Sequence, residues 1–273
     1  MCGRFASSTP IAALAEQFLV AEIEADERDA SYNVAPTDDV YAVVARHGSR
    51  RLGSLSWGLL PSWSEDASPS RRMINLRAET VRGKGSFRRL LERRRCAVPA
   101  DGFYEWKQMG RGRPKQPFFI TGRDRRPLAL AGLWAAWRDP AGEEAGVGAP
   151  AGEKSHGAGR GWGPRLGEEA GVGAPAGEKS QDGEKTWLRT CTIITTEPNG
   201  LVAPLHDRMP VILAEEAWDM WLDEEQTDTD LLGSLLVPYP SELLEMWPVG
   251  PDVNSVANDG PRLVKPLEGH EPS

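Results

Sequence analysis

The chain has 273 residues, a formal net charge of −8 and only three cysteines, which are Cys2, Cys96 and Cys191. This length suits one large domain or two small ones with a sizeable core, and so few, widely spaced cysteines exclude a disulfide framework or a CxxC metal site. Neither a signal peptide nor the roughly 18–20 apolar residues of a membrane span is found. We therefore expect a reduced, cytoplasmic protein.

Short strands dominate the predicted elements. A helix is predicted from Pro10 to about Ala25, with Thr9 as its N-cap and Pro10 at its first position. Because helices do not alternate regularly with strands, we expect an α+β fold with a curved, barrel-like mixed sheet flanked by helices. The remaining predicted elements are strands at 40–46, 51–57, 95–99, 102–107, 117–121, 128–137, 189–195 and 209–213, and helices at 86–94, 215–223 and 228–236.

An internal duplication interrupts this pattern. The sequence GEEAGVGAPAGEKS occurs at 142–155 and again, identically, at 167–180. This stretch is rich in Gly, Ala and Glu and has no periodic apolar face, so it buries too little surface to offset the entropy cost of ordering. We expect one domain spanning residues 1–273, with a disordered insertion at about 139–186 between two core strands.

The opening MCGRF raises the question of why a cysteine stands at position 2. Since cysteine is small, removal of Met1 is expected and leaves Cys2 with both a thiol and a free α-amine. These two nucleophiles on adjacent carbons condense with an aldehyde to form a five-membered thiazolidine ring. The alternative is a loose terminal residue with no chemical role.

Three further side chains could support such a condensation. Glu105 lies between Tyr104 and Trp106 in a strand-like run, where desolvation would raise its pKa toward neutrality and make it a general acid. The amide of Asn75 suits orientation of a sugar oxygen, and the imidazole of His206 suits proton transfer near neutral pH. A salt bridge, a turn cap and a loop hydrogen bond are the ordinary structural alternatives for these three residues.

The charge is distributed very unevenly along the chain. Residues 71–126 contain 17 Lys and Arg against five Asp and Glu, a formal charge of +12, which leaves −20 for the rest. An electropositive face on an acidic protein would produce this split, as would a solvated surface with no partner. Arginines for phosphates would come from Arg4, Arg77 and the 82–95 cluster, and Trp63 would provide a stacking surface for a base.

Nine short stretches of the chain form a distinctive set: MCGRF at 1–5, YNVAPT at 32–37, WGLLPSW at 57–63, INLRAET at 74–80, CAVPADGFYEWK at 96–107, PFFI at 117–120, TIITTEPNG at 192–200, LHDRMPVIL at 205–213 and VNSVAN at 253–258. As a set, they resemble the SOS-response-associated peptidase (SRAP) family, which shields abasic sites in DNA. The resemblance covers nearly the whole chain except the 139–186 insertion. It implies a single domain with a β-barrel-like core, binding to single-stranded DNA and to single/double-strand junctions, and phosphate contacts from Arg4 and Arg77.

The resemblance also implies a mechanism. Cys2 forms a covalent thiazolidine link to the ring-opened sugar of an abasic site, Asn75 positions that sugar, and His206 acts on it. Glu105 serves as the acid and base, also in reversal of the link, and assists autocatalytic removal of Met1. No metal, cofactor or membrane is implied, and we expect a monomer that associates with the nucleoid when bound to DNA.

Two other functional classes stay open at this point. An N-terminal-nucleophile amidohydrolase would use Cys2 against an amide such as that of glutamine, and it would need an oxyanion hole. A non-catalytic single-strand-binding module would leave Cys2 inert. A metal site of Cys2, Glu105 and His206 is a fourth interpretation, although these residues lack a metal-ligand spacing.

Overall fold

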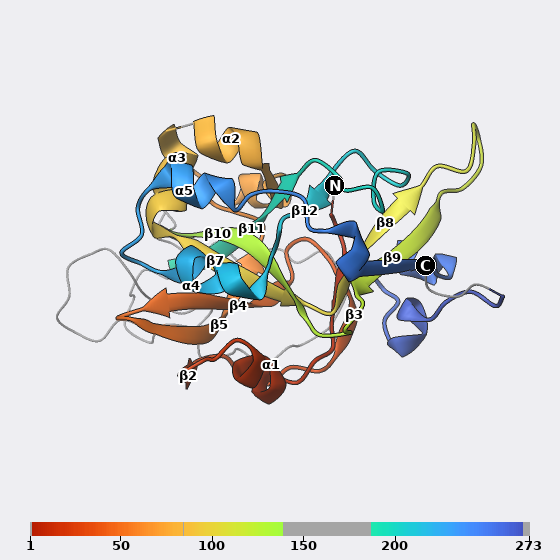
Figure 1. Cartoon of the computed structure of the whole chain (residues 1–273), viewed down its shortest axis with the longest axis horizontal. Helices are drawn as coiled ribbons and strands as arrows, with labels where there is room; N and C mark the ends of the chain where they lie inside the picture. The colour runs from red at the N-terminus through yellow and green to blue at the C-terminus, as the bar shows by residue number, and fades with distance from the viewer. Residues whose placement is uncertain (1, 84, 139–186, 270–273) are drawn as a thin grey trace.

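Five strands form a closed ring at the centre of the molecule (Figure 1). The computed structural model describes residues 2–83, 85–138 and 187–269. The strands pair antiparallel in the order β5–β4–β7–β10–β11. Parallel pairing of β5 with β11, with Trp57 opposite Cys191, closes the barrel. The five strands are β4 (Asp39–Arg46), β5 (Ser49–Trp57), β7 (Arg95–Ala100), β10 (Leu128–Arg138) and β11 (Trp187–Thr196).

Four short strands extend the barrel. The first, β2 (Glu22–Ile23), runs parallel to β5, while β6 (Asn75–Arg77) runs parallel to β11. On the antiparallel side, β12 (Met209–Pro210) pairs with β11 and β13 (Ile212–Leu213) pairs with β10. The strand β6 therefore brings Asn75 to the side of β11.

A second sheet of five antiparallel strands carries the N-terminal segment, in the order β14–β9–β8–β1–β3. Phe5 lies opposite Phe103 on one side and opposite Val34 on the other, so the first strand is paired on both sides, between β8 and β3. Its strands are β1 (Phe5–Ser7), β3 (Ser31–Val34), β8 (Gly102–Lys107), β9 (Gln116–Gly122) and β14 (Leu244–Pro248).

The barrel strands β7, β10 and β11 and the middle of β4 are buried on both faces, which explains their long apolar runs. Ala42 and Val44 of β4 pack in a cluster with Cys2 and the second sheet. The intervening residues Tyr41 and Val43 pack in another cluster with residues of the helices. A strand covered on only one face would instead alternate apolar and polar residues.

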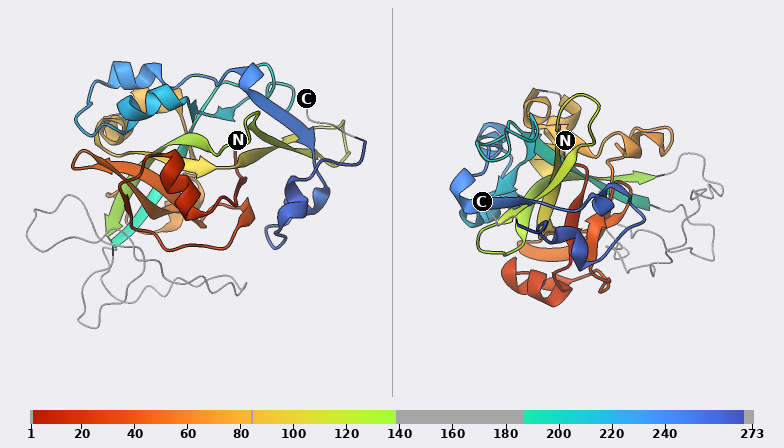
Figure 2. Two further views of the ribbon diagram at one scale, coloured as in Figure 1. Left: turned by 60° about the horizontal axis from the view of Figure 1, so that its bottom comes forward. Right: turned by 90° about the vertical axis from the view of Figure 1, so that its right-hand side faces the viewer.

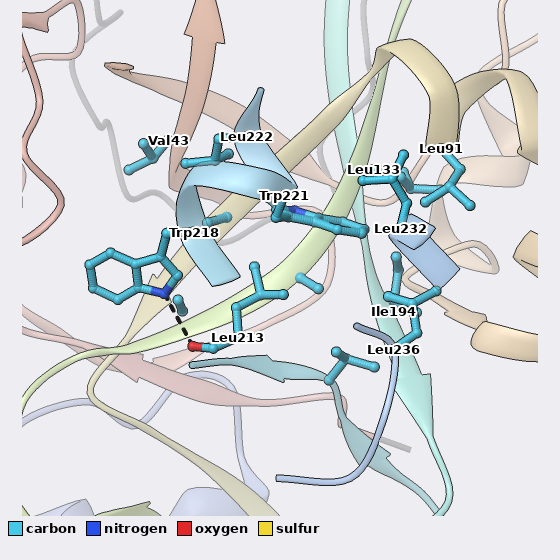
Figure 3. Close-up of a cluster of buried hydrophobic side chains, with 14 of the residues drawn as sticks. Val43, Leu91, Leu133, Ile194, Leu213, Trp218, Trp221, Leu222, Leu232 and Leu236 are labelled. Carbon is cyan, nitrogen blue, oxygen red and sulfur yellow. Dashed lines mark hydrogen bonds between the residues drawn. The ribbon is translucent and has the colours of Figure 1, made fainter. Parts of the chain in front are cut away.

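Helices cover the outer face of the barrel, with α1 on one side and α2, α3 and α5 on another (Figures 1 and 2). In the cluster drawn in Figure 3, Trp218 donates from Nε1 to the carbonyl oxygen of Leu213 at 3.1 Å, so a large buried ring also satisfies its polar atom. The α-helices are α1 (Ile11–Gln17), α2 (Ala78–Gly83), α3 (Gly85–Arg93), α4 (Trp218–Leu222) and α5 (Thr229–Ser234), and the 3₁₀ helices are η1 (Ser68–Arg71), η2 (Glu215–Ala217), η3 (Ser241–Leu243), η4 (Pro251–Asn254) and η5 (Pro261–Val264).

The expected α+β class with a barrel-like mixed sheet is confirmed, and the strand predicted at 102–107 coincides with β8. The strand predicted at 209–213 is instead two, β12 and β13. Within the described residues, no helix is long and apolar enough to cross a membrane. The insertion predicted at 139–186, with its repeats at 142–155 and 167–180, lies outside the described residues.

The helix predicted at 10–25 is wrong in length and in its N-cap. Just after α1, Leu19 adopts φ 51°, a left-handed conformation that ends the helix, and β2 then pairs with β5. Thr9 does not cap the helix, because its hydroxyl donates to Asp101 Oδ1 at 2.6 Å and Pro10 occupies the N-cap position. Tertiary partners therefore override the local helix signal at both ends.

Candidate functional site

The pairing of β1 with β8 brings the N-terminal segment to Glu105. The two strands are antiparallel, and Tyr104 N–H donates to the Arg4 carbonyl oxygen at 3.0 Å. Stepping back from Arg4 to Cys2 therefore advances along β8 toward Glu105. The Glu105 charge raises the pKa of the Cys2 thiol, as expected for two groups held close together.

Cys2 is fully buried in a chain that still begins with Met1. Its thiol faces the Arg4 carbonyl oxygen at 3.9 Å. Burial, and then Glu105, raise the pKa of this thiol well above its ordinary value. Cys2 is therefore a neutral thiol near pH 7 in this form of the chain.

Asn75 contacts the backbone of Cys2 directly. It stands at the start of β6, opposite Ile193 of β11, and its Nδ2 donates to the Cys2 carbonyl oxygen at 2.7 Å. Its Oδ1 is buried and has no hydrogen-bond partner among the residues that the structure describes. An unsatisfied buried acceptor costs about 1–3 kcal/mol, so this oxygen is suited to receive a hydroxyl of a bound molecule.

Glu105 is 1% exposed, on β8. Desolvation by burial raises the pKa of its carboxyl to about 7, with Asp207 also raising it and Lys115 lowering it. A carboxyl in this range is present in both protonation states near neutral pH. It can therefore donate a proton in one step and accept one in another.

His206 lies in the loop before β12, with its side chain 30% exposed. Its Nδ1 accepts from the Arg208 N–H at 3.0 Å, which leaves the proton of the neutral ring on Nε2. The Asp207 carboxylate, 2.8 Å from the same Nδ1, favours the charged ring. Burial outweighs it and lowers the pKa of His206, so the neutral ring predominates at pH 7.

An ion pair holds the loop that carries His206. Arg208 binds both carboxylate oxygens of Glu79 on α2 at 3.0 Å and donates to the Thr195 carbonyl oxygen at 2.6 Å. The role of Arg208 as an anchor was not predicted from the sequence, although the residue stands in the LHDRMPVIL stretch. Its partner Glu79 is distant along the chain, so sequence spacing gives no sign of the pair.

The three predicted DNA contacts lie in different environments. Arg4 donates to Asn33 Oδ1 at 2.7 Å and to the Val253 carbonyl oxygen at 2.9 Å, so much of its guanidinium binds within the protein. Arg77 is exposed at the end of β6, two residues from Asn75. Trp63 is 58% exposed in the segment after β5. Arg77 and Trp63 are thus accessible to a ligand, and all three roles stay predictions.

The structure brings together Cys2, Asn75 and Glu105, and His206 shares the charged neighbours Asp207 and Lys115 with Glu105. In the described part of the chain, no three His, Cys, Asp or Glu side chains are grouped so that they could hold a metal ion. The arrangement instead combines a thiol, an amide, a carboxyl titrating near neutrality and an imidazole. These groups suit nucleophilic addition with proton transfer.

The chain belongs to the SOS response associated peptidase (SRAP) family, whose sequence model matches residues 1–153 and 168–256. The family expected from the sequence motifs is thereby confirmed. Abasic site processing protein YoqW of Bacillus subtilis (strain 168) is 36% identical over 266 residues, covering 97% of this chain and 99% of YoqW. Abasic site processing protein HMCES of Gallus gallus is 33% identical over 269 residues, covering 87% of this chain and 66% of HMCES.

Solved structures support the fold. A crystal structure of a protein from Bacteroides thetaiotaomicron has a TM-score of 0.71 and 22% identity, covering 97% of this chain and all (100%) of that chain. One from Bordetella bronchiseptica has a TM-score of 0.64 and 22% identity, covering 91% and 100% of the two chains. The barrel described above is therefore shared with known structures.

Proposed function

We propose that this protein processes abasic sites in DNA and links to them covalently through Cys2. The relatives named above are abasic site processing proteins, and they align with nearly the whole chain or most of it. The observation that carries the covalent step is Glu105, a buried carboxyl with its pKa raised to about 7, acting electrostatically on the cysteine at position 2. An inert buried thiol would not require a neighbouring carboxyl whose pKa lies in the range useful for proton transfer.

The proposed reaction joins two nucleophiles to one carbon. After Met1 removal, the Cys2 amine adds to the C1′ aldehyde of the ring-opened sugar and gives a carbinolamine. Protonated Glu105 donates to its hydroxyl, which leaves as water, and an imine forms. The Cys2 thiol then adds across the C=N bond, its sulfur bonding to C1′ and its proton passing to nitrogen. One water is lost overall.

The other site residues act on the sugar in this proposal. Asn75 holds the Cys2 backbone through Nδ2 and accepts a sugar hydroxyl at its buried Oδ1. Neutral His206 presents Nε2–H, which donates to a sugar oxygen as the ring opens. Glu105, once deprotonated, is the base that can reverse the link.

The proposal includes Met1 removal by the protein itself, with Cys2 as nucleophile and Glu105 as acid and base. It also includes preference for single-stranded DNA and its junctions with duplex, bound by a monomer. Arg77 would hold a phosphate and Trp63 would stack on a base, which their exposure supports.

Intact mass measurement tests the covalent step and Met1 removal together. After mixing with an abasic oligonucleotide, a new species should appear. Its mass should be that of the protein without Met1 plus that of the oligonucleotide, minus one water. Cys2→Ala should give none, and an N-terminal extension that blocks the amine should also abolish it. Cys96→Ala, which alters another fully buried cysteine, on β7, is the matched control and should still form the adduct. An adduct with Cys2→Ala would refute the thiazolidine link.

The same preparations distinguish the alternative functions. Release of ammonia from glutamine without adduct formation would favour an amidohydrolase. Salt-dependent binding of single-stranded DNA that is indifferent to abasic sites, again without adduct, would favour a binding module.

A further inference from the structure

Much of the positive charge of residues 71–126 is used inside the fold. Arg95 is buried and donates to four backbone carbonyl oxygens. The guanidinium of Arg94 lies 4.4 Å from the centre of the Trp134 ring. Arg82 donates to the carbonyl oxygens of Gly233 in α5 and of Leu236, just after that helix. Acidic side chains pair with Arg88, Arg125 and Arg126. Within the 82–95 cluster, Arg82, Arg94 and Arg95 are therefore structural, whereas Arg88, Arg89 and Arg93 are exposed on α3.

The hairpin that joins β8 to β9 has a different character. Its residues 107–115 contain Lys107, Arg111, Arg113 and Lys115 and no acid. The last three are exposed, and none of the four pairs with an acidic side chain in the described ranges. Figure 1 shows this hairpin projecting from the side of the molecule away from α2–α5. It is a concentrated positive surface.

Backbone contacts give the hairpin a defined turn. Gly110 and Gly112 have φ of 119° and 78°, which other residues rarely adopt. The Arg113 N–H donates to the Gly110 carbonyl oxygen at 3.2 Å, and Gln108 Nε2 donates to the same oxygen at 2.7 Å. The turn is therefore held by its own backbone and by the Gln108 side chain, and the cationic side chains take no part in these contacts.

The hairpin also borders the candidate site. Lys107 is two residues beyond Glu105 on the same strand. At the other end of the hairpin, the charge of Lys115 lowers the pKa of both Glu105 and His206, so this cation lies within electrostatic reach of both. A DNA strand whose sugar enters the site would pass this surface.

We propose that residues 107–115 form an arm that binds the phosphodiester backbone of single-stranded DNA beside the abasic sugar. This inference rests on the proposed function for the position of the sugar. The arm supplies several cations that are not paired with acidic side chains, and it continues directly from the strand that carries Glu105. A flexible single strand of DNA is bound through such cations, which contact its phosphates.

The test compares two charge-matched variants. The arm variant Lys107→Gln/Arg111→Gln/Arg113→Gln retains Lys115 because of its reach to Glu105. The control Arg88→Gln/Arg89→Gln/Arg93→Gln removes three exposed cations from α3. Affinity for an intact single-stranded oligonucleotide is measured against salt concentration. Each lost phosphate contact should reduce the slope of log K against log salt by about 0.7, so the arm variant should lose about 2 and the control nothing.

The outcomes separate this inference from the proposed function. An arm variant with the wild-type slope, or a control that loses as much, would overturn the arm even if the wild type forms its adduct. A reduced slope in the arm variant alone would support the arm even if no adduct forms with abasic DNA, in which case the covalent proposal fails. The single variant Arg111→Gln, which should lose about 0.7, guards against a folding defect in the triple variant.

Discussion

Asn75 Nδ2 donates to the Cys2 carbonyl oxygen at 2.7 Å and so ties the N-terminal segment to the barrel. Asn75 is itself held by the pairing of β6 with β11. The amide therefore fixes the backbone that carries the proposed nucleophiles, while its Oδ1 faces no partner among the described residues. Both ends of one short side chain thus bear on the proposed reaction.

Replacing Asn75 by Ala should slow adduct formation at saturating DNA. A typical hydrogen bond contributes about 1 kcal/mol, which corresponds to roughly a fivefold lower rate, and loss of the Oδ1 contact to the sugar would add to this. Single-turnover rates measured on gels provide the test. Asn75→Asp, which keeps the shape but loses the Nδ2 donor, should be at least as slow. A wild-type rate in Asn75→Ala would remove the residue from the mechanism.

The raised pKa of Glu105 predicts a specific dependence of stability on pH. The pKa rises from 4.5 in the free group to about 7 in the fold, so the folded state binds the proton more tightly. Its contribution to stability is complete below pH 4.5 and is lost as the pH rises toward 7. One pKa unit corresponds to 1.36 kcal/mol, which makes the loss about 3 kcal/mol.

Glu105→Gln should therefore gain stability relative to the wild type between pH 4.5 and pH 7, where the pKa shift acts. Denaturant unfolding at pH 4.5 and pH 8 measures this difference. Lys107→Gln, on the same strand, is the control and should show no such trend. Equal stability differences at the two pH values would show that the carboxyl titrates normally.

The pairing of Glu79 with Arg208 predicts that a change on α2 affects the His206 loop. Glu79→Gln should lower the adduct rate severalfold, yet cost less than about 1 kcal/mol of stability because the Glu79 side chain is 63% exposed. Arg208→Lys keeps the charge but loses the two-oxygen contact. If the pair acts as a unit, the double variant should be no slower than the slower single variant. Additive effects in this cycle would rule out coupling.

Trp63→Ala should weaken binding of single-stranded DNA without unfolding the protein. Stacking of one base on an aromatic ring contributes about 1–3 kcal/mol. Since Trp63 is 58% exposed, stability should change by less than about 0.5 kcal/mol. Trp63→Phe should retain part of the affinity, and neither variant should alter the salt slope. Unchanged affinity in Trp63→Ala would exclude a stacking role.

Gly132→Ala should destabilise the barrel. A Cβ added to Gly132 would lie 2.8 Å from Cys96 Sγ and 3.0 Å from the Thr192 carbonyl oxygen. Overpacking of this kind costs about 1–3 kcal/mol, measurable by denaturant unfolding. Gly83→Ala, where nothing lies within 4 Å, is the control. Adding Cys96→Ala should relieve part of the strain, so that the double variant is more stable than the summed single effects predict.

Local apolar patterns predicted most strands, because most of the barrel strands are buried along much of their length. In the second sheet, the bounds of β8 likewise follow from the apolar and aromatic run at 102–107. The closing contact between β5 and β11 could not be predicted, since it joins strands far apart in sequence and depends on barrel curvature. Nor could the end of α1, where pairing of β2 with β5 overrides a helical pattern.

The sequence predicted the residues of the candidate site itself better than the surrounding residues that hold them or act on their charges. Cys2 and Glu105 stood out because a cysteine at position 2 and a carboxyl among aromatics are unusual. The buried Arg95 shows the limit of reading charge, because its place in a basic cluster suggested phosphate binding whereas it binds backbone carbonyl oxygens. Arg208 and Lys115 were not singled out, since their roles depend on neighbours that only the fold provides.

The last pair of β10 and β11, Arg138 opposite Trp187, has a practical consequence. The two strand ends are already held side by side, so whatever chain joins them does not have to span a gap in the barrel wall. Asn75, which binds the Cys2 backbone, pairs with β11 at Ile193. Ile193 is six residues along the strand from Trp187, so the Arg138–Trp187 junction is remote from Asn75. A fluorescent reporter or a minimal turn grafted between these two residues should therefore give a probe or a shortened protein in which the candidate site is unchanged.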